Sequence, residues 1–139
     1  MAGVQMIIMI NKKEGTTDLE FYKYWNEVHG PMFLDKVPLA RKYISKYEQY
    51  HMNGAERSEI VKQMADAGSV SVDRCDGVSV LSADSLEDLQ KVLTSKEFLE
   101  TVNPDNHVYA GQITSVLLSE GEKVLMYERD ADAAATGPR

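Results

Sequence analysis

The chain has 139 residues, of which 43% are apolar and 27% are charged, and this composition is typical of a single soluble globular domain. A formal charge of −7, with scattered lysines and arginines, argues against a nucleic-acid or anionic-lipid partner. A lone cysteine, Cys75, excludes an intrachain disulfide and a thiolate zinc site. There is no run of about 20 apolar residues to cross a membrane and no secretory signal pattern. We therefore expect a cytoplasmic protein.

The first part of the chain predicts a strand followed by a helix. Residues 4–11 form an apolar run of strand length that is rich in isoleucine. Thr17 is followed three residues later by Glu20, which is the spacing of a capping box, and a helix is expected over residues 18–29. The Gly30-Pro31 pair should end that helix, because proline lacks an amide donor and disfavours a helical conformation in the residue before it.

A second strand is expected over residues 42–51, where alternate side chains share one face. The side chains on that face are Tyr43, Ser45, Tyr47, Gln49 and His51. A polar excursion follows over residues 53–74, and within it residues 59–67 can form a short helix. The third strand is expected over residues 77–82.

The second half of the chain predicts another capped helix and further strands. Asp84 and Glu87 mark a helix start, and the apolar stripe that follows is Leu86, Leu89 and Leu93. One or two further helical turns are expected over residues 95–102, and Asn103-Pro104-Asp105 should end them.

The end of the chain predicts two strands and a tail. The fourth strand is expected over residues 112–119, and a turn at Glu120-Gly121 leads to a short fifth strand over residues 123–128. Residues 130–139, which are rich in alanine and aspartate, should be disordered. We therefore expect one domain over residues 1–129.

The order of these elements predicts the fold class. Strand, helix, strand, strand, helix and strand is the order of the ferredoxin-like βαββαβ unit, an α+β fold. Its helices cover one face of an antiparallel sheet, and in so short a chain the other face needs a second copy to cover it. Two such sheets would close a dimeric α+β barrel and remove exposed strand edges. The fold therefore predicts a homodimer.

Three histidines, His29, His51 and His107, are the candidates for proton transfer near neutral pH. His29 follows Trp25 by four residues, so the two share a helix face. If the helix ends there, the negative end of its dipole favours the protonated imidazole. This placement suits a proton donor, and the sequence does not decide which histidine is the acid and which is the base.

Other polar residues are expected near a cleft. His51 shares its strand face with Tyr43 and Tyr47, and such a strip of hydroxyl and imidazole groups can line a polar cavity. Asp105 and His107 follow a predicted helix end, where loop side chains can project toward the mouth of a cleft.

Each candidate also has a purely structural interpretation. His29 can cap helix carbonyls, tyrosines favour strands whatever their function, and Asp105 suits a turn. The stripe that contains Phe21 and Trp25 favours a place in the core. The histidines lack the short spacing of zinc motifs, and there is no phosphate-binding or dinucleotide fingerprint. We expect no metal site and no cofactor.

The most specific pattern in the chain is Phe-x-x-x-Trp-x-x-x-His-Gly-Pro over residues 21–31. It stands with an apolar first strand, Glu14-Gly15-Thr16-Thr17, the segment Tyr43 to His51, Asp76-Gly77-Val78 and the late Asp105. In these features the chain resembles the EthD family of dimeric α+β barrels, over roughly Met6 to Leu118.

The resemblance implies a homodimer whose subunits each hold a cavity between sheet and helices. It also implies activity on aromatic polyketides of secondary metabolism, as a dehydratase, decarboxylase or cyclase. His29 matches the family's His-Gly-Pro histidine, His51 the histidine that closes the second strand, and Asp105 the late acidic position. Asn106 departs from the family pattern, which often has a second acidic residue there.

Together, residues and resemblance predict a cofactor-independent lyase or cyclase that acts on an aromatic or polyketide intermediate. His29 and His51 would act as acid and base, and Asp105 would orient them or bind substrate oxygens. The residues expected to bind substrate are Tyr43, Tyr47, Trp25 and His107. Two alternatives stay open: a cofactor-free monooxygenase or isomerase in the same cleft, and a non-catalytic binding or chaperone module for a small molecule.

Overall fold

The structure is a computed structural model that describes residues 3–54, 58–68 and 75–131. Four strands form one antiparallel sheet in the order β2-β3-β1-β4. They are β1 (Val4–Lys12), β2 (Ile44–His51), β3 (Gly77–Ala83) and β4 (Ala110–Ser119). Strands and helices follow one another as in the ferredoxin-like unit, which confirms the predicted α+β fold class.

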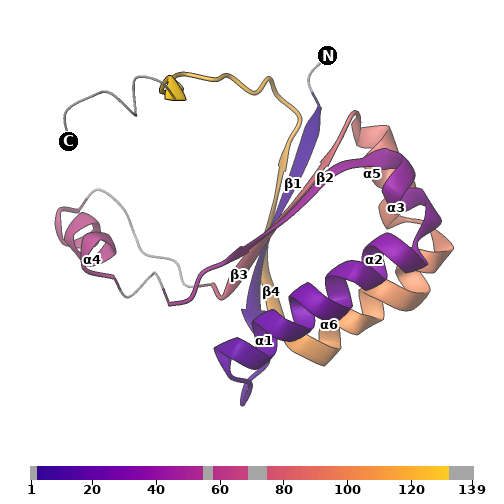
Figure 1. The fold of residues 1–139 in the computed structure, drawn as a ribbon, viewed down its shortest axis with the longest axis horizontal. Helices are drawn as coiled ribbons and strands as arrows, with labels where there is room; N and C mark the ends of the chain where they lie inside the picture. The colour runs from indigo at the N-terminus through magenta and orange to yellow at the C-terminus, as the bar shows by residue number, and fades with distance from the viewer. Residues whose placement is uncertain (1–2, 55–57, 69–74, 132–139) are drawn as a thin grey trace.

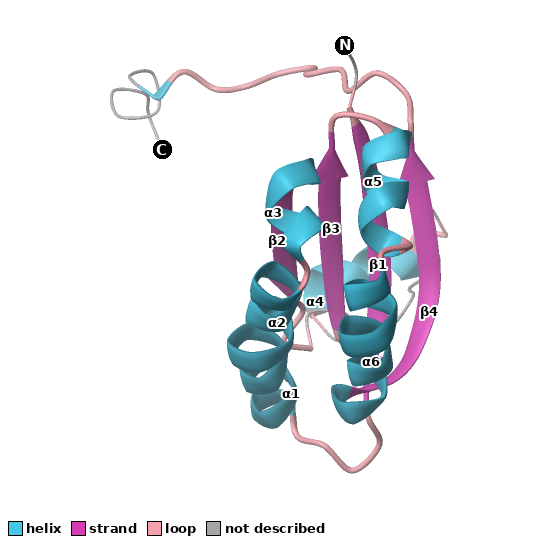
Figure 2. Ribbon diagram, turned by 90° about the vertical axis from the view of Figure 1, so that its right-hand side faces the viewer, coloured by secondary structure: helices cyan, strands magenta, loops and turns pink. Residues whose placement is uncertain are grey.

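Most of the helices lie on one face of the sheet. The helices of the described residues are α1 (Asp18–Tyr24), the π-helix η1 (Trp25–His29), α2 (Gly30–Lys36), α3 (Pro38–Tyr43), α4 (Glu59–Asp66), α5 (Leu86–Leu93), the π-helix η3 (Phe98–Val102) and α6 (Asn103–Tyr109). Of these helices, α4 lies on the opposite side of the sheet from the others (Figures 1 and 2). It confirms the short helix predicted in the polar excursion, of which residues 55–57 and 69–74 lie outside the described ranges. Among the described residues, no helix is long and apolar enough to span a membrane.

The core fills the space between the sheet and the helices that cover it. One cluster is centred on the fully buried Val37, Leu89 and Val92, and a second on Phe21 and Trp25. The capping box predicted before α1 is present, with the Thr17 hydroxyl accepting from the Glu20 amide and the Glu20 carboxylate accepting from the Thr17 amide. It starts the helix in the register that buries the aromatic rings.

Trp25 packs directly on the backbone of Gly77, and this contact predicts a large effect of a small substitution. A Cβ atom at residue 77 would lie 2.5 Å from the Trp25 ring. Because the ring is itself buried, we expect Gly77→Ala to reduce the free energy of unfolding by about 1–3 kcal/mol. Urea unfolding measures this loss. Gly121→Ala is the matched control, since nothing lies within 4 Å of a Cβ there, and an equal loss in both variants would contradict the packing argument.

The first helix does not end at Gly30-Pro31, as the sequence predicted, but continues into α2 through a π-turn. In η1 the Gly30 amide donates to the Trp25 carbonyl, five residues earlier. A wider turn relieves the contact between the proline ring and the carbonyl four residues before it, which otherwise breaks a helix. His29 therefore lies inside a continuous helical run, and the prediction that it sits at a helix C-terminus is wrong. The helix-dipole argument for a protonated imidazole no longer applies there.

A second π-turn shows that the helix end predicted at residues 103–105 is wrong. In η3 the Asn103 amide donates to the Phe98 carbonyl, and Pro104 then sits in the first turn of α6, where proline is tolerated. Asp105 consequently lies on a helix that faces η1 and not on a loop.

Other elements also differ from the prediction. Strand β2 begins at Ile44, because Tyr43 ends the helix α3 that follows Pro38. Ser85, rather than Asp84, caps α5 by accepting a hydrogen bond from the Asp88 amide. Residues 123–128 form no strand, and the predicted tail lies outside the described residues from residue 132 onward.

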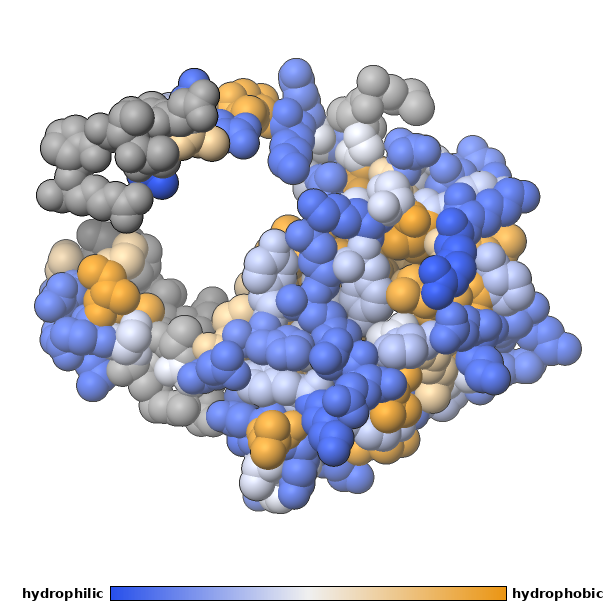
Figure 3. Space-filling model, viewed as in Figure 1, coloured by the Kyte–Doolittle hydropathy of each residue, from blue (hydrophilic) through white to orange (hydrophobic). Residues whose placement is uncertain are grey.

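The face of the sheet turned away from the covering helices carries apolar side chains. Ile7 of β1 is paired with Val80 of β3 and with Leu117 of β4, and Leu117 is 51% exposed. On this side lie α4 and the extended segment after β4 (Figure 1). Both carry apolar surface (Figure 3), including Ile60 in α4 and Met126 in the segment, at 63% and 87% exposed. Exposed apolar side chains gathered on one side of a protein can mark a face that associates with another molecule.

Candidate active site

Asp105 joins His29 and Tyr24 in a hydrogen-bonded group between two helical runs. Oδ2 of Asp105 lies 2.8 Å from Nδ1 of His29, and Oδ1 accepts a hydrogen bond of 2.8 Å from the Tyr24 hydroxyl. The side chains of His29 and Asp105 are only 8% and 9% exposed. The packing of η1 against α6 brings these two residues together across 76 positions of sequence.

The contact with Asp105 fixes which nitrogen of His29 carries a proton. An ionised carboxylate can only accept, so Nδ1 is the donor and Nε2 of the neutral ring keeps the lone pair. The ring of Tyr109 packs on the imidazole, with 4.5 Å between centroids. A carboxylate that orients an imidazole in this way is the arrangement of a general base.

Burial lowers the pKa of His29 below its usual value of 6.5, and this effect outweighs the hydrogen bond and charge of Asp105, which raise it. The imidazole is therefore neutral at pH 7. Burial, followed by the hydrogen bond to Asp105, raises the pKa of Tyr24 to about 12, so the Tyr24 hydroxyl remains a donor. A neutral His29 is suited to accept a proton, which is the base role of the acid and base pair that the sequence assigned to His29 and His51 together.

We expect the stability of the fold to decrease as the pH falls below about 6.5, the usual pKa of histidine. In that range the unfolded chain takes up a proton that the buried His29 resists, and folding is disfavoured. The pKa of His51 is also lowered by burial and acts in the same direction. NMR titration of the imidazoles and urea unfolding at several pH values check this. A His29 pKa above 6.5, or stability that rises on acidification through this range, would contradict the expectation.

His29 faces a small cavity between the sheet and the helices, here called the inner cavity, of about 80 Å³. Its walls include six ring side chains: Trp25, His29, Phe33, Tyr47, Phe98 and Tyr109. Apolar residues of the sheet, among them Ile8 and Leu81, close its floor. A cavity with aromatic walls and a buried base is suited to a flat apolar group that carries an acidic proton.

A second and more open cleft of about 570 Å³, here called the outer cleft, lies along β2 beside η1 and α2. It is lined by Asn26, Gly30, Pro31, Leu34, Tyr47, Gln49 and His51. Tyr47 lines both this cleft and the inner cavity. The side chain of Tyr47 therefore forms the shared wall between them.

Side chains of β2 are linked by hydrogen bonds along the outer cleft. Nε2 of Gln49 lies 3.0 Å from the Tyr47 hydroxyl and 3.1 Å from the Trp25 carbonyl. Oε1 of Gln49 lies 3.1 Å from Nε2 of His51. Gln49 thus connects the two β2 residues to the π-turn that positions His29.

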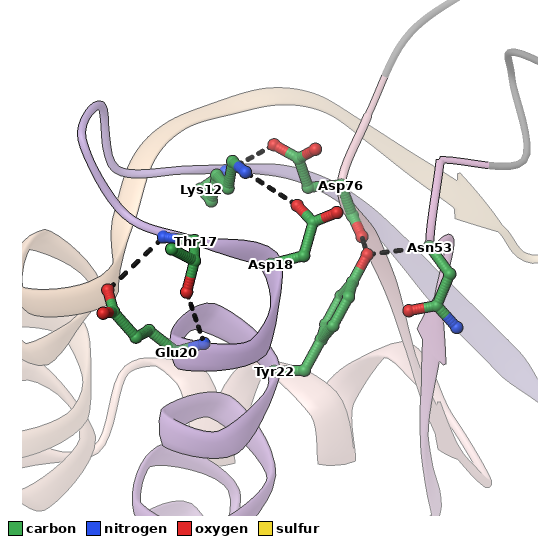
Figure 4. Close-up of polar contacts among 7 residues, drawn as sticks. All are labelled: Lys12, Thr17, Asp18, Glu20, Tyr22, Asn53 and Asp76. Carbon is green, nitrogen blue, oxygen red and sulfur yellow. Dashed lines mark hydrogen bonds and ion pairs between the residues drawn. The ribbon is translucent and has the colours of Figure 1, made fainter.

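His51 is held in place by aromatic stacking and, indirectly, by a polar network at the end of β1. Its ring stacks on Tyr22, with 4.5 Å between centroids. The Tyr22 hydroxyl donates to the Asp76 carbonyl and accepts from the Asn53 amide, both at 2.8 Å, and the Asp76 carboxylate accepts from the Lys12 amide (Figure 4). The network fixes the Tyr22 ring and so the imidazole that stacks on it.

The structure brings together four of the seven site residues predicted from the sequence. His29, Trp25 and Tyr47 line the inner cavity, and Asp105 binds His29. His51 lines the outer cleft instead, and its ring stacks on Trp25. Within the described ranges, no three His, Cys, Asp or Glu side chains lie close enough to hold a metal ion.

The other two predicted residues lie elsewhere. Tyr43 packs against the lysine side chains of Lys42 and Lys91 and lines neither cavity. His107 is exposed and lines a separate small pocket at the start of β4. Both misplacements follow from the helix boundaries, because Tyr43 belongs to α3 and His107 to the outer side of α6.

Sequence reasoning missed the roles of Tyr24, Gln49 and Tyr109. Tyr24 was grouped with a core stripe, and only its position five residues before His29 in a π-turn places both on the side that meets Asp105. Gln49 did appear on the correct strand face, and its two-residue spacing from Tyr47 and His51 was the available signal. Tyr109 carries no such signal in the sequence.

Comparison with known proteins gives a family and a fold. The family model of the EthD domain matches residues 13–112, which is more than half of the chain. No curated protein sequence matches. The solved structure of an EthD-like protein from Ralstonia eutropha has a TM-score of 0.60 and 14% identity, over 91% of this chain and 96% of that one.

Two other solved structures share the fold. An EthD family protein from Bacillus halodurans has a TM-score of 0.58 and 16% identity, over 86% of this chain and 98% of that one. A hydroxynitrile lyase from Passiflora edulis has a TM-score of 0.53 and 10% identity, over 89% and 97%. At these identities the likeness concerns the fold alone. With the domain match over residues 13–112, the chain belongs to the EthD family.

Proposed function

We propose that the protein is a cofactor-independent lyase or cyclase that acts on a carbonyl-bearing aromatic or polyketide intermediate. The observation that carries this proposal is the buried pair of His29 and Asp105 at the inner cavity, which leaves Nε2 of a neutral imidazole as a base. A structure with the same fold is named as a hydroxynitrile lyase, so the fold is compatible with lyase chemistry.

The state of His29 favours reactions that begin by removing a proton. Dehydration of a β-hydroxy ketone and aldol-type ring closure both start when a base takes the proton next to a carbonyl. The imidazolium formed is stabilised by the Asp105 carboxylate and can return the proton to the leaving hydroxyl or to the new alkoxide. Decarboxylation requires an acid at this point, and the lowered pKa of His29 suits it less.

The cavity limits which part of a substrate can enter. Ligand pockets for whole small molecules usually measure about 300 Å³ or more, whereas the inner cavity measures about 80 Å³. We infer that the reacting ring or side chain enters between Trp25, Phe33 and Tyr109 while the rest of the substrate stays nearer the surface. Aromatic walls favour flat rings.

We also propose that the protein works as a homodimer, in which the apolar sheet face of one copy covers that of another. Light scattering at micromolar concentration should give twice the monomer mass, because Ile7, Val80 and Leu117 lie on the sheet face turned away from the covering helices. Replacing Leu117, which is 51% exposed, by aspartate should shift the protein toward monomer. A wild-type monomer at that concentration would contradict the proposal.

A turnover assay tests the enzymatic proposal against a binding role. The purified protein is incubated, without added cofactor, with a panel of one-ring and two-ring aromatic β-hydroxy ketones and β-diketones, and the products are followed by mass spectrometry. We expect consumption of at least one class, with loss of water or ring closure, and unchanged rates in His107→Gln, whose exposed side chain lies outside the inner cavity. Saturable binding of a panel member without any turnover would contradict the lyase proposal and favour a non-catalytic binding module.

A further inference from the structure

We propose that Tyr47 is the hydrogen-bond donor to a ligand carbonyl oxygen in the inner cavity, and that Gln49 is the positioning residue that directs its proton there. The ligand class that this site takes is a neutral ketone or aldehyde. The inference rests on the proposed function, because removal of a proton by His29 next to a carbonyl creates charge on that carbonyl oxygen.

The orientation of the Gln49 amide follows from its contact with η1. The atom 3.1 Å from the Trp25 carbonyl must be a donor, because a backbone carbonyl can only accept. Nitrogen Nε2 therefore faces the π-turn, and oxygen Oε1 faces His51, from whose Nε2 it accepts a hydrogen bond of 3.1 Å. Both ends of the amide are thus held, and its orientation is fixed by the backbone.

This orientation decides the direction of the hydrogen bond to Tyr47. The same Nε2 lies 3.0 Å from the Tyr47 hydroxyl and has hydrogens to give, so the tyrosine oxygen is the acceptor. The hydroxyl proton must then point elsewhere, and in the described part of the chain no residue accepts it. Tyr47 lines the inner cavity together with His29, and it also lines the outer cleft. We assign the proton to a ligand oxygen in the inner cavity, because the proposed base His29 lines that cavity and not the outer cleft.

The surroundings keep the proton on Tyr47 and keep Gln49 in place. Burial raises the pKa of Tyr47 more than hydrogen bonds with Gln49 and Trp25 lower it, so the hydroxyl stays protonated at neutral pH. The absence of a side chain at Gly30 makes room for the amide, since a Cβ there would lie 3.1 Å from Nε2 of Gln49. The glycine of the His-Gly-Pro segment therefore has a role at this site.

Cyclopentanone is a suitable probe, because it is a small apolar ring with one carbonyl group and fits a cavity of this size. Its bound carbonyl stretch is measured by difference infrared spectroscopy on the full-length protein, with affinity taken from the same titration. A hydrogen bond to the carbonyl oxygen lowers the stretching frequency. The variants are Tyr47→Phe, which removes the donor, and Gln49→Glu. The Glu carboxylate would accept the hydrogen bond from the Tyr47 hydroxyl, so that the hydroxyl no longer donates to the ligand.

We expect the wild-type band at lower frequency than that of Tyr47→Phe, with about fivefold weaker binding in the variant, the usual effect of one lost hydrogen bond. Gln49→Glu should lose at least half of the frequency shift. Asn26→Ala, which changes only the outer cleft, should keep the wild-type band. If Gln49→Glu does not fold, Gln49→Leu takes its place and should give a band between those of wild type and Tyr47→Phe.

Two results would overturn the inference. An unchanged band in Tyr47→Phe would show that Tyr47 is not the donor, and an unchanged band in the Gln49 variant that folds would show that Gln49 does not direct it. His29→Gln separates this inference from the proposed function, because it should keep the wild-type band while it loses turnover. A shifted band in a protein that turns over no substrate would leave the ligand site intact and reject only the lyase.

Discussion

His29→Gln should lose most of the turnover, by about 100-fold or more, which is the usual contribution of a general base. Glutamine has nearly the size of histidine and can still donate from its amide to the Asp105 carboxylate, so the buried hydrogen bond is kept. It cannot take up a proton near neutral pH. The measurement is the steady-state rate on the panel substrate that the wild type consumes, together with the midpoint of thermal unfolding.

The control for this variant is His107→Gln, which makes the same exchange on the exposed surface of α6. It should keep wild-type rates. If His29→Gln retains the wild-type rate while it folds normally, His29 is only a hydrogen-bond donor within the helical run. The base would then have to be sought at His51 in the outer cleft.

Asp105→Asn should have the second largest effect, again a loss of about 100-fold or more. An amide can donate as well as accept, so it can reverse the hydrogen bond and leave the proton on the wrong nitrogen of His29. Loss of the carboxylate also removes the charge that stabilises the imidazolium. Because Asp105 raises the pKa of His29, its replacement should lower that pKa further, and NMR titration of the imidazole measures this independently of any substrate.

Tyr24→Phe is the matched variant, because it removes one hydrogen bond to Asp105 and leaves the carboxylate in contact with His29. We expect a loss of turnover of about tenfold or less, and a loss of about 1 kcal/mol in the free energy of unfolding. Equal effects of Tyr24→Phe and Asp105→Asn on turnover would argue against a special role for the carboxylate.

The sequence predicted the architecture well where local chemistry decides the structure. The capping box of Thr17 and Glu20, the alternation of residues 44–51 and the apolar periodicity of α5 each report a backbone state that a few neighbouring residues determine. Strand order then follows from the topology of the βαββαβ unit. The resemblance to the EthD family, based mainly on residues 21–31, was confirmed by the domain match.

The π-turns could not be predicted, and they explain most of the errors at the site. By the ordinary rule that proline ends a helix, Gly30-Pro31 and Asn103-Pro104 each predict a helix end. In the structure, a widened π-turn precedes each proline and the helical run continues. The same two turns place His29 and Asp105 on facing helices and bury them, which reverses the expected protonation of the histidine.

The relation among residues of β2 was also beyond the sequence. The alternation placed Tyr47, Gln49 and His51 on one face, but the direction of their hydrogen bonds depends on the Trp25 carbonyl of the π-turn. Nor could spacing show that His51 and His29 line two different cavities. The sequence predicted that His29 and His51 act together as acid and base. Our proposal instead has one base, His29, with the carboxylate of Asp105 as its partner.

The central claim is that a neutral His29 acts as a base at the inner cavity, and deuterium exchange of a ketone tests it most directly. Cyclopentanone is incubated with the protein in heavy water, and exchange of the hydrogens next to its carbonyl is followed by NMR as a function of pH. We predict protein-catalysed exchange that rises with pH to a plateau, with a midpoint below the usual histidine pKa of 6.5, and its loss in His29→Gln. A rate that falls as the pH rises through this range, or equal exchange in wild type and His29→Gln, would contradict the claim.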